Sequence, residues 1–414
     1  MNIDRRSLIA LTAAGFASAP AVSFAASPSA PRWVGAWASA QQIPEPHNAL
    51  DPADMTDATV RQIVRLMIGG SKLRVRLSNR FGTEPLAFSA VHVARTVALG
   101  SAAIEPGSDR PLTFDGRPDL IIPAGAEYTS DPMDLAMPAL SHLTITYHLP
   151  LAPKVQTSHP GSRTTSFTAK GARVGEADLP DAKRVAHWYQ IAGIDVLAAP
   201  KAAAIAIIGD SITDGFGVTP DTHTRWPDRL AERLQASAAT RHLSVLNHGI
   251  GGNRILNDGL GPNALARFDR DVLNQTGVKY AVILEGVNDL GTLTRDAPAT
   301  PEQHDALVRR MIGAYRQMVE RGRARGLKMI GATILPYGAS PYYHPDARNE
   351  ADRQAVNRWI RTPGNFDAVI DFDAIMRDPA RPERLRADLD NDGLHPSLAG
   401  YRFMGDAVPL GLFR

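Results

Sequence analysis

The chain has 414 residues, of which 44% are hydrophobic and 21% charged, and its 45 Lys and Arg residues nearly balance 43 Asp and Glu residues. This is the composition of a globular protein of about two domains, not of a disordered or fibrous chain. A formal charge of +2 without a long basic run argues against nucleic acid as a partner. The absence of cysteine excludes disulfides, thiolate metal sites and cysteine nucleophiles.

The first 26 residues have the pattern of an export signal. The charged start contains Arg5 and Arg6, and the moderately apolar stretch 8–24 ends near the small residues Ser23 and Ala25, which suit signal peptidase. The arginine pair before Ser7 resembles a twin-arginine signal. An uncleaved membrane anchor is the alternative, but the stretch is too polar and too interrupted for a good spanning helix. We therefore expect a periplasmic or secreted protein without stable membrane insertion after signal removal, and the cleavage position stays open.

Residues 31–198 have the pattern of an all-β domain. Leu73, Val75 and Leu77 alternate with charged residues, as in a half-buried strand, and the pattern predicts 59–68 as its hairpin partner through the turn 69–71. Further predicted strands are 86–93, 120–122, 143–149, 164–167 and 188–196. Short strands separated by Gly, Pro and Asp turns indicate a β-sandwich, with a jelly roll as the favoured topology.

Residues 201–414 have the pattern of an α/β domain. Continuous apolar runs, typical of buried parallel strands, occur at 204–208, 244–246, 280–284, 328–334 and 369–370. Helical patterns lie between them at 226–234, 303–325 and 349–361, and a last helix is predicted to begin at Ser397. This alternation predicts a three-layer domain with a parallel sheet. Ligands of such sheets bind beyond the carboxyl ends of the strands, so residues that follow the strands are the first candidates for a site.

Polar and glycine-rich segments occur at those places. They are 209–215 (GDSITDG), 247–254 (NHGIGGNR), 285–289 (EGVND) and, just before the last helix, 392–396 (DGLHP). A serine hydroxyl needs a neighbouring base to act as a nucleophile, and His395 is a candidate base for Ser211. Asp392 lies three residues before His395, close enough to orient its ring. These residues predict acyl transfer with Ser211, His395 and Asp392 as a catalytic triad.

The same segments contain donors for an oxyanion, which the tetrahedral intermediate of acyl transfer requires. The backbone N–H of Ser211 comes with the nucleophile. Gly252 has no Cβ to shield its N–H, and Asn288 offers a side-chain amide. We therefore predict an oxyanion hole made by Ser211, Gly252 and Asn288.

Other chemistries are less compatible with the sequence. The G-x-S-x-G elbow, the H-E-x-x-H zinc motif and the Walker loop are absent. Gly249-x-Gly251 lacks the third glycine of a dinucleotide site. The repeat Asp388-x-Asp390-x-Asp392 resembles the start of a calcium loop, but position twelve is Ala399 instead of Glu. We expect neither a cofactor nor a metal.

The four segments together resemble the SGNH (GDSL-type) hydrolase superfamily, over residues 204–411. The resemblance implies a flavodoxin-like sheet, the triad Ser211, Asp392 and His395, and the oxyanion hole Ser211, Gly252 and Asn288. It gives Asp210 and Asp289 a structural role in their loops. It also implies an open, mobile active site without a dedicated lid.

The first half carries a second, less specific resemblance. Residues 33–38 (WVGAWA) and 73–82 (LRVRLSNRFG) resemble the β-sandwich of a subgroup of exported esterases similar to rumen-bacterial enzymes encoded beside xylanases. We therefore expect a serine ester hydrolase that removes short acyl groups, such as acetyl from saccharides, or cleaves aryl esters. A lysophospholipase or thioesterase is the alternative chemistry, and a carbohydrate-binding protein with an inactive hydrolase domain is the alternative class. The expected partner is a small-molecule or oligosaccharide ester, and the oligomeric state stays open.

Overall fold

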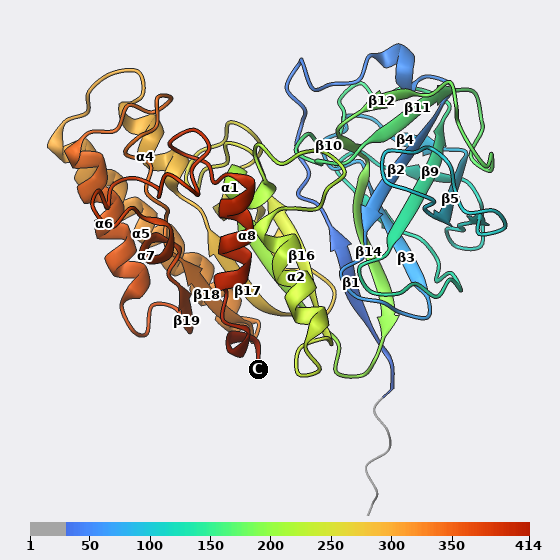
Figure 1. Cartoon of the computed structure of the whole chain (residues 1–414). Helices are drawn as coiled ribbons and strands as arrows, with labels where there is room; N and C mark the ends of the chain where they lie inside the picture. Colours follow the sequence, from blue (N-terminus) through green and yellow to red (C-terminus); the bar gives the residue numbers. More distant parts are fainter. Residues whose placement is uncertain (1–29) are drawn as a thin grey trace, which may run out of the picture. The chain divides into compact units, whose positions relative to one another are not determined.

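The structure, a computed structural model, describes residues 30–414 (Figure 1). The predicted export signal, 1–26, lies outside the described residues, so the signal remains a prediction. None of the helices in residues 30–414 combines the length and the apolar character that a membrane crossing requires.

The first part of the described chain, residues 31–198, is built from antiparallel strands, and we call it the β region. Its elements are β1 (Arg32–Ala38), a 3-10 helix η1 (Pro52–Met55), β2 (Ala58–Arg65), β3 (Leu73–Ser78), β4 (Leu86–Phe88), β5 (Ala90–Arg95), β6 (Arg110–Pro111), β7 (Leu120–Ile122), β8 (Glu127–Thr129), β9 (His142–Leu149), β10 (Ser158–His159), β11 (Ser166–Lys170), β12 (Lys183–Val185), β13 (Trp188–Tyr189) and β14 (Ile191–Ala198). The larger sheet has the order β12-β11-β2-β9-β5-β6, and the second has the order β1-β14-β3-β8. The pairs β4-β7 and β10-β13 form short ribbons.

Side chains from both main sheets share one apolar core, which makes the β region a sandwich. Leu73, Val75 and Leu77 of β3 are buried in this core, as their alternation predicts. Val60 of β2 and Ile145 of β9 enter it from the other sheet. Each such aliphatic side chain contributes roughly 1.5–3 kcal/mol when it is fully buried, so the shared core holds the sheets face to face. The all-β class of this region is confirmed.

The predicted hairpin between 59–68 and the strand that follows it is wrong. β2 pairs with β11 and β9 in one sheet, whereas β3 pairs with β14 and β8 in the other. In the link, the N–H of Gly70 donates to the carbonyl of Met137, and that of Ser71 donates to the carbonyl of Leu197, both at 3.0 Å. The glycine turn therefore carries the chain between the layers of the sandwich, a connection that strand alternation does not distinguish from a hairpin. The predicted strand 86–93 is likewise divided into β4 and β5, which lie in different sheets.

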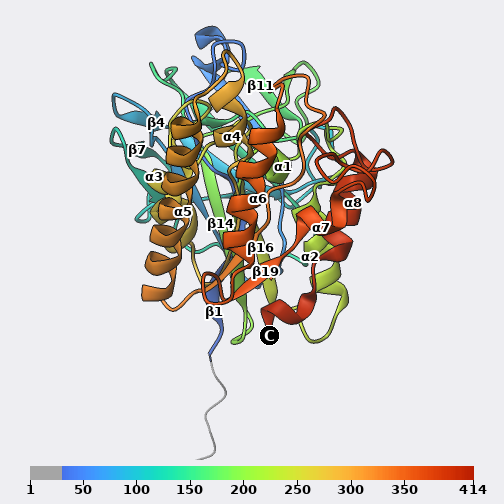
Figure 2. The ribbon, with the colours of Figure 1, turned by 90° about the vertical axis from the view of Figure 1, so that its left-hand side faces the viewer.

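The second part, residues 201–414, alternates strands and helices, and we call it the α/β region. Its elements are β15 (Ala203–Gly209), α1 (Ser211–Asp214), α2 (Trp226–Ala236), β16 (Leu243–Gly249), α3 (Ala264–Phe268), a π-helix η2 (Asp269–Leu273), β17 (Val278–Leu284), α4 (Val287–Thr294), α5 (Pro301–Ala324), β18 (Lys328–Ala332), α6 (Ala347–Arg361), β19 (Ala368–Ile370), α7 (Phe372–Met376), α8 (Leu398–Ala407) and a 3-10 helix η3 (Leu410–Phe413). The strands form a parallel sheet of order β16-β15-β17-β18-β19. This is the flavodoxin-like order 2-1-3-4-5. Helix α2 lies beside α8, and α5 beside α6 (Figures 1 and 2), so the predicted three-layer α/β class is confirmed.

The two regions meet along β1 and β16. The N–H of Gly35 in β1 donates to the carbonyl of Thr276 at 2.9 Å, and Leu246 of β16 belongs to the apolar core of the β region. A Cβ on Gly35 would lie 2.9 Å from Leu246 Cδ1, so a larger residue there would push on the Leu246 side chain at the junction. β14 ends at Ala198 and β15 begins at Ala203. The domain boundaries 31–198 and 201–414 remain predictions.

Candidate active site

The predicted site residues follow the carboxyl ends of neighbouring strands in the parallel sheet. Ser211 comes directly after β15, Gly252 after β16 and Asn288 after β17, while His395 precedes α8. Since β16, β15 and β17 are adjacent and parallel, their carboxyl ends lie at one edge of the sheet. Segments far apart in the sequence are thereby brought together where the sequence pattern predicts a site.

Ser211 is the first residue of α1, a single helical turn at the end of β15. The side chain of Asp210 caps this turn by accepting a hydrogen bond from the N–H of Ile212 at 2.9 Å. Gly215 ends the turn in the left-handed conformation, at φ 89°. Ser211 is only 5% exposed, and its Oγ lies 2.9 Å from Nε2 of His395. The predicted serine and histidine are therefore in hydrogen-bond contact.

Asp392 holds His395 in the orientation that a base requires. Its Oδ2 lies 2.9 Å from Nδ1 of His395, and its Oδ1 accepts from the backbone N–H groups of His395 and Leu394 at 2.8 and 3.1 Å. Partial burial opposes the ionisation of Asp392, but the hydrogen bonds from His395 outweigh it and lower the pKa of Asp392 to about 2. An ionised carboxylate accepts the proton of Nδ1, which leaves Nε2 as the acceptor for the Ser211 hydroxyl.

The backbone donors of the predicted oxyanion hole are available. Within residues 30–414, neither the N–H of Ser211 nor that of Gly252 has a hydrogen-bond partner. Gly252 adopts φ +69°, and a Cβ there would lie 2.4 Å from Cδ1 of Leu260. Glycine is therefore required at this position by both conformation and space.

The side-chain donor, Asn288, is held at both ends of its amide. Its Nδ2 donates to the carbonyl of Asn253 at 2.7 Å, and its Oδ1 accepts from the hydroxyl of Tyr343 at 2.6 Å. An amide nitrogen carries two hydrogens, so one remains for an oxyanion. Because the Tyr343 hydroxyl is a donor here, the amide cannot turn over without losing a hydrogen bond.

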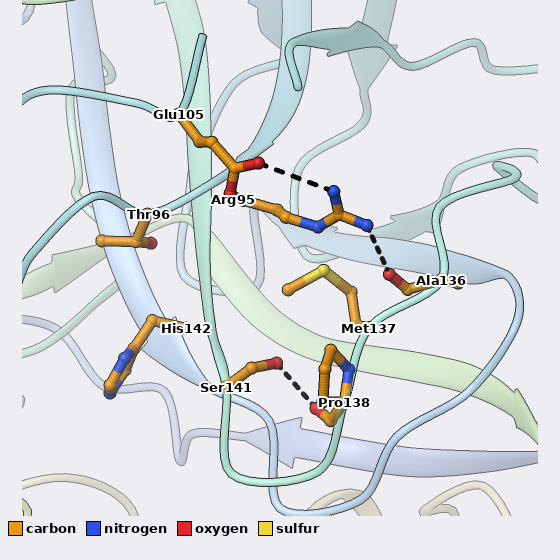
Figure 3. A pocket seen from close by; sticks show the side chains of 8 residues that line it. All are labelled: Arg95, Thr96, Glu105, Ala136, Met137, Pro138, Ser141 and His142. Atoms are coloured by element: carbon orange, nitrogen blue, oxygen red, sulfur yellow. Dashed lines mark hydrogen bonds and ion pairs between the residues drawn. The ribbon is translucent and has the colours of Figure 1, made fainter. Parts of the chain in front are cut away.

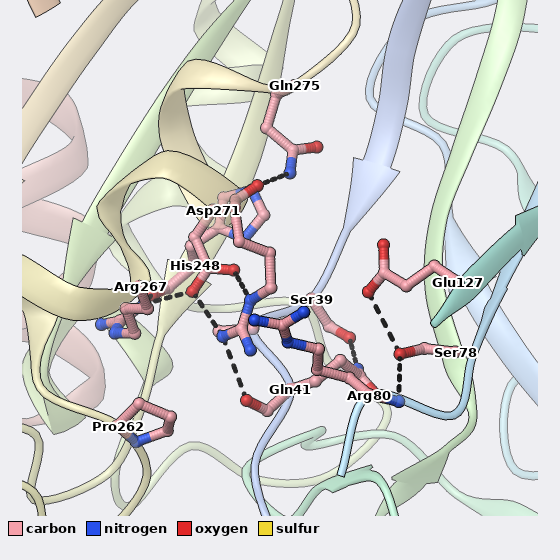
Figure 4. Close-up of polar contacts among 12 residues, drawn as sticks. Ser39, Gln41, Ser78, Arg80, Glu127, His248, Pro262, Arg267, Asp271 and Gln275 are labelled. Atoms are coloured by element: carbon pink, nitrogen blue, oxygen red, sulfur yellow. Dashed lines mark hydrogen bonds and ion pairs between the residues drawn. The ribbon is translucent and has the colours of Figure 1, made fainter. Parts of the chain in front are cut away.

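A buried arginine connects the loops that carry these groups. Arg267 is 2% exposed, and its guanidinium donates to the carbonyls of Gly209 and His248 at 3.0 and 2.7 Å and to Asn253 Oδ1 at 3.0 Å. It also pairs with Asp271 at 2.9 Å and with Glu285 at 3.3 Å. Figure 4 shows Arg267 and Asp271 beside His248. Arg267 therefore ties together the segments that follow β15, β16 and β17.

Buried carboxyl groups surround this arginine. Asp289 accepts hydrogen bonds from the N–H groups of Ile255 and Leu256 at 2.7 and 3.1 Å, but burial still raises the pKa of Asp289 to about 6. Burial and mutual repulsion raise the pKa values of Asp210 and Glu285 as well. These contacts fit the structural roles implied for Asp210 and Asp289. Asp289 lies in the first turn of α4.

A cavity of about 570 Å³ lies in the β region, apart from this site, where Arg95 bridges Glu105 and the carbonyl of Ala136 (Figure 3). None of the predicted site residues lines it. Within residues 30–414, no group of three or more His, Cys, Asp or Glu side chains is arranged to hold a metal ion.

Sequence reasoning missed three residues that contact the predicted site. Phe216 stacks on the ring of His395 with centroids 4.1 Å apart, Tyr343 orients Asn288, and Arg267 joins the loops. Tyr343 lies in the segment that follows the fourth parallel strand, β18. A search of the residues after that strand would therefore include Tyr343. No spacing or motif marks Phe216 or Arg267, because their contacts arise only in the folded chain.

Among solved structures, the chain resembles a GDSL-like lipase from Bacteroides thetaiotaomicron (21% identity, 51% of this chain and 88% of that chain, TM-score 0.38). It also resembles a catalytic mutant of an acetylxylan esterase from Geobacillus stearothermophilus (23% identity, 50% of this chain and 91% of that chain, TM-score 0.39). None of the curated proteins compared with the chain matches it.

Residues 207–403 match the model of the GDSL-like lipase/acylhydrolase family. This range contains every residue of the predicted triad and oxyanion hole, in the order that the resemblance implies. Residues 207–403 are therefore a GDSL-like lipase/acylhydrolase domain, and the protein is a carboxylic ester hydrolase.

Proposed function

We propose that the protein hydrolyses short-chain carboxylic esters through an acyl-enzyme on Ser211. The observation that carries this proposal is the continuous contact from Ser211 Oγ to His395 Nε2 at 2.9 Å and from His395 Nδ1 to Asp392 Oδ2 at 2.9 Å. In that arrangement a neutral His395 takes the hydroxyl proton as Ser211 attacks, and the ionised Asp392 stabilises the imidazolium that forms.

The reaction proceeds in two balanced steps. Ser211 Oγ bonds to the ester carbonyl carbon while its proton moves to His395, and the tetrahedral intermediate collapses by expelling the alcohol, which takes that proton. Water then attacks the acyl-enzyme, gives its proton to His395, and releases the carboxylic acid as Ser211 regains a proton. The N–H groups of Ser211 and Gly252 and the amide of Asn288 stabilise the oxyanion in both steps.

The side chains around the centre favour a small acyl group. Leu260 packs against Gly252 beside the oxyanion hole, and Phe216 covers one face of the His395 ring. These apolar groups restrict the space around a serine that is only 5% exposed. The ring of Phe216 is 43% exposed and offers a stacking surface for an aryl or sugar ring in the alcohol part. Acetylated saccharides and simple aryl esters are therefore the proposed substrates.

A substrate panel tests the proposal against its alternatives. Purified protein is assayed on p-nitrophenyl esters of rising acyl length, acetylated xylan, acetylated pectin, a lysophospholipid and an acyl thioester. We expect kcat/KM to be highest for acetyl or propionyl esters and to be lost in Ser211→Ala and His395→Ala. Preference for a long acyl chain or a lysophospholipid would favour the lysophospholipase alternative, and preference for the thioester would favour a thioesterase. Binding of saccharide without any turnover would favour the inactive-hydrolase alternative.

We also propose that the protein is exported to the periplasm or the medium. Support comes from the Arg5–Arg6 pair, the apolar stretch and the small residues near Ala25. In a bacterial host, replacement of Arg5 and Arg6 by Lys should leave the protein in the cytoplasm, whereas the unaltered chain is found outside it and shortened. Cytoplasmic accumulation of the unaltered, full-length chain would contradict this proposal.

A further inference from the structure

A buried histidine from the β region contacts the helical turn that carries Ser211. His159 lies on β10, and its Nε2 is 3.0 Å from Oδ1 of Asp214, the last residue of α1. His159 is 3% exposed and Asp214 is 2% exposed. The ring of His159 also stacks on Trp188, with centroids 5.7 Å apart. The contact therefore joins the two regions immediately behind the proposed nucleophile.

Both hydrogen-bond partners of His159 are acceptors. Its Nδ1 lies 2.8 Å from the carbonyl of Ala40, which can only accept, and its Nε2 faces the carboxylate of Asp214. Burial opposes the ionisation of Asp214, but attraction to His159 outweighs it and lowers the pKa of Asp214. Each ring nitrogen of His159 thus faces an acceptor, and His159 and Asp214 form a buried hydrogen-bonded pair.

The surroundings of Asp214 leave it little freedom. A Cβ on Gly161 would lie 1.8 Å from Asp214 Oδ2, and a Cβ on Gly249 would lie 2.4 Å from the Asp214 nitrogen. The N–H of Asp214 donates to the carbonyl of Asp210 at 2.9 Å, which closes the turn around Ser211. Arg163, Arg225, Asp210 and His187 are further titratable or charged groups close to the pair. A shift of Asp214 therefore displaces either the turn of Ser211 or the end of β16.

We propose that His159 is a positioning residue for ester hydrolysis: the β region supplies it, and it fixes Asp214 and thereby the turn that carries Ser211. This inference rests on the proposed role of Ser211 as nucleophile. His159 does not touch the reacting atoms, and its effect is transmitted through the backbone of α1. Misplacement of a reacting group by about 1 Å can cost about 100-fold in rate, so loss of the pair should reduce turnover more than substrate binding.

The test compares His159→Gln and Asp214→Asn with the unaltered protein, using p-nitrophenyl acetate and an organophosphonate that titrates active serines. Glutamine cannot reach both Ala40 and Asp214 as the imidazole ring does, and Asp214→Asn removes the negative charge at nearly constant size. Per folded molecule, each variant should lose about 10- to 100-fold in kcat. KM should change less than about threefold, and phosphonate labelling should slow in parallel. The double variant should lose less than the product of the single losses, since both substitutions break the same contact.

His148→Gln is the matched control. His148 also lies in the β region, and its Nε2 is 3.1 Å from Asp57 Oδ1, but this pair touches no residue of the proposed site. This control should leave kcat per folded molecule unchanged. If His159→Gln or Asp214→Asn folds and keeps its full kcat, the positioning role is overturned and the pair is only structural. Activity of Ser211→Ala in parallel assays would contradict the proposed function itself. Failure of the proposed function can therefore be told apart from failure of the positioning role of His159.

Discussion

Arg61 in the β region and Arg267 in the α/β region are both almost completely buried, but the two guanidinium groups serve different parts of the molecule. Arg61 of β2 donates to the carbonyls of Ala102 and Glu176 and to the hydroxyl of Thr146, and burial lowers its pKa. Arg267 instead binds the ends of β15 and β16 and pairs with two buried carboxylates. One arginine secures loops over a sandwich, whereas the other secures the loops that carry the candidate site.

This difference shows how the two regions divide their tasks. In the α/β region, buried charges gather at the carboxyl ends of the sheet, where they support the loops that carry the proposed oxyanion donors. In the β region, the buried polar groups mainly satisfy the sandwich itself, and His159 is the contact that reaches the turn of Ser211. Because burying charge is costly, such a cluster is expected where function needs it.

The largest expected effect comes from separating the regions. A fragment that begins at Lys201 would expose Leu246, which lies in the core of the β region, and would lack His159. We expect this fragment to be insoluble, or soluble without activity, by light scattering and p-nitrophenyl acetate assay. A well-folded, fully active fragment would show that the regions are independent in both stability and catalysis.

Asn288→Ala should have the next largest effect, because the amide stabilises an oxyanion that develops only in the transition state. The loss of one such donor usually reduces kcat by about 100–1,000-fold, or about 2.7–4 kcal/mol, with little change in KM. Melting temperature and kcat are measured on the same preparation. A lower melting temperature with normal kcat per folded molecule would remove Asn288 from the mechanism and leave it as a structural link to Asn253.

Replacement of each buried arginine by lysine tests the comparison directly. Lysine keeps the charge but cannot reproduce the planar array of donors. Arg267→Lys should reduce kcat about tenfold, or about 1.4 kcal/mol, because the loops it joins carry the site. Arg61→Lys should cost about 1–3 kcal/mol of stability in urea unfolding without changing kcat per folded molecule. Equal effects of both variants on kcat would contradict the division of tasks.

The smallest expected effect concerns the pH dependence of stability. Burial raises the pKa of Asp210 above the unfolded value of about 3.9, so its ionisation destabilises the folded state as pH rises above that value. Asp210→Asn keeps the cap on Ile212 and should therefore gain stability relative to the unaltered protein between pH 4 and neutrality, measured by melting temperature.

Asp131 of the β region is the control with the opposite sign. Hydrogen bonds from Thr113 and Gly116 lower its pKa, so its ionised form favours folding. Asp131→Asn should then lose relative stability as pH rises toward the unfolded pKa of about 3.9, and the difference from the unaltered protein should stay nearly constant from about pH 5 to neutrality. If the melting temperatures of Asp210→Asn and Asp131→Asn, each relative to the unaltered protein, changed with pH in the same direction, the contrast between the two carboxyl groups would be contradicted.

Sequence reasoning succeeded where the signals are local. Parallel strands appear as short apolar runs, and the predicted site follows their ends, so Ser211, Asn288 and His395 become candidates from their order in the sequence alone. The β region is harder, because strand alternation reveals which face is buried but not which strand is the partner, and β2 and β3 were wrongly paired. Residues that act through tertiary contacts, such as Arg267 and His159, carry no motif and become evident only in the folded chain.

The most direct test of the account is to identify the residue that an organophosphonate modifies in the active protein. The account predicts one label per chain, on the peptide that contains Ser211, with loss of activity in proportion to labelling. Ser211→Ala should remain unlabelled and keep its melting temperature, since the hydroxyl contacts only His395 among the described residues. Stoichiometric labelling of another serine with loss of activity, or full activity in Ser211→Ala, would contradict the account.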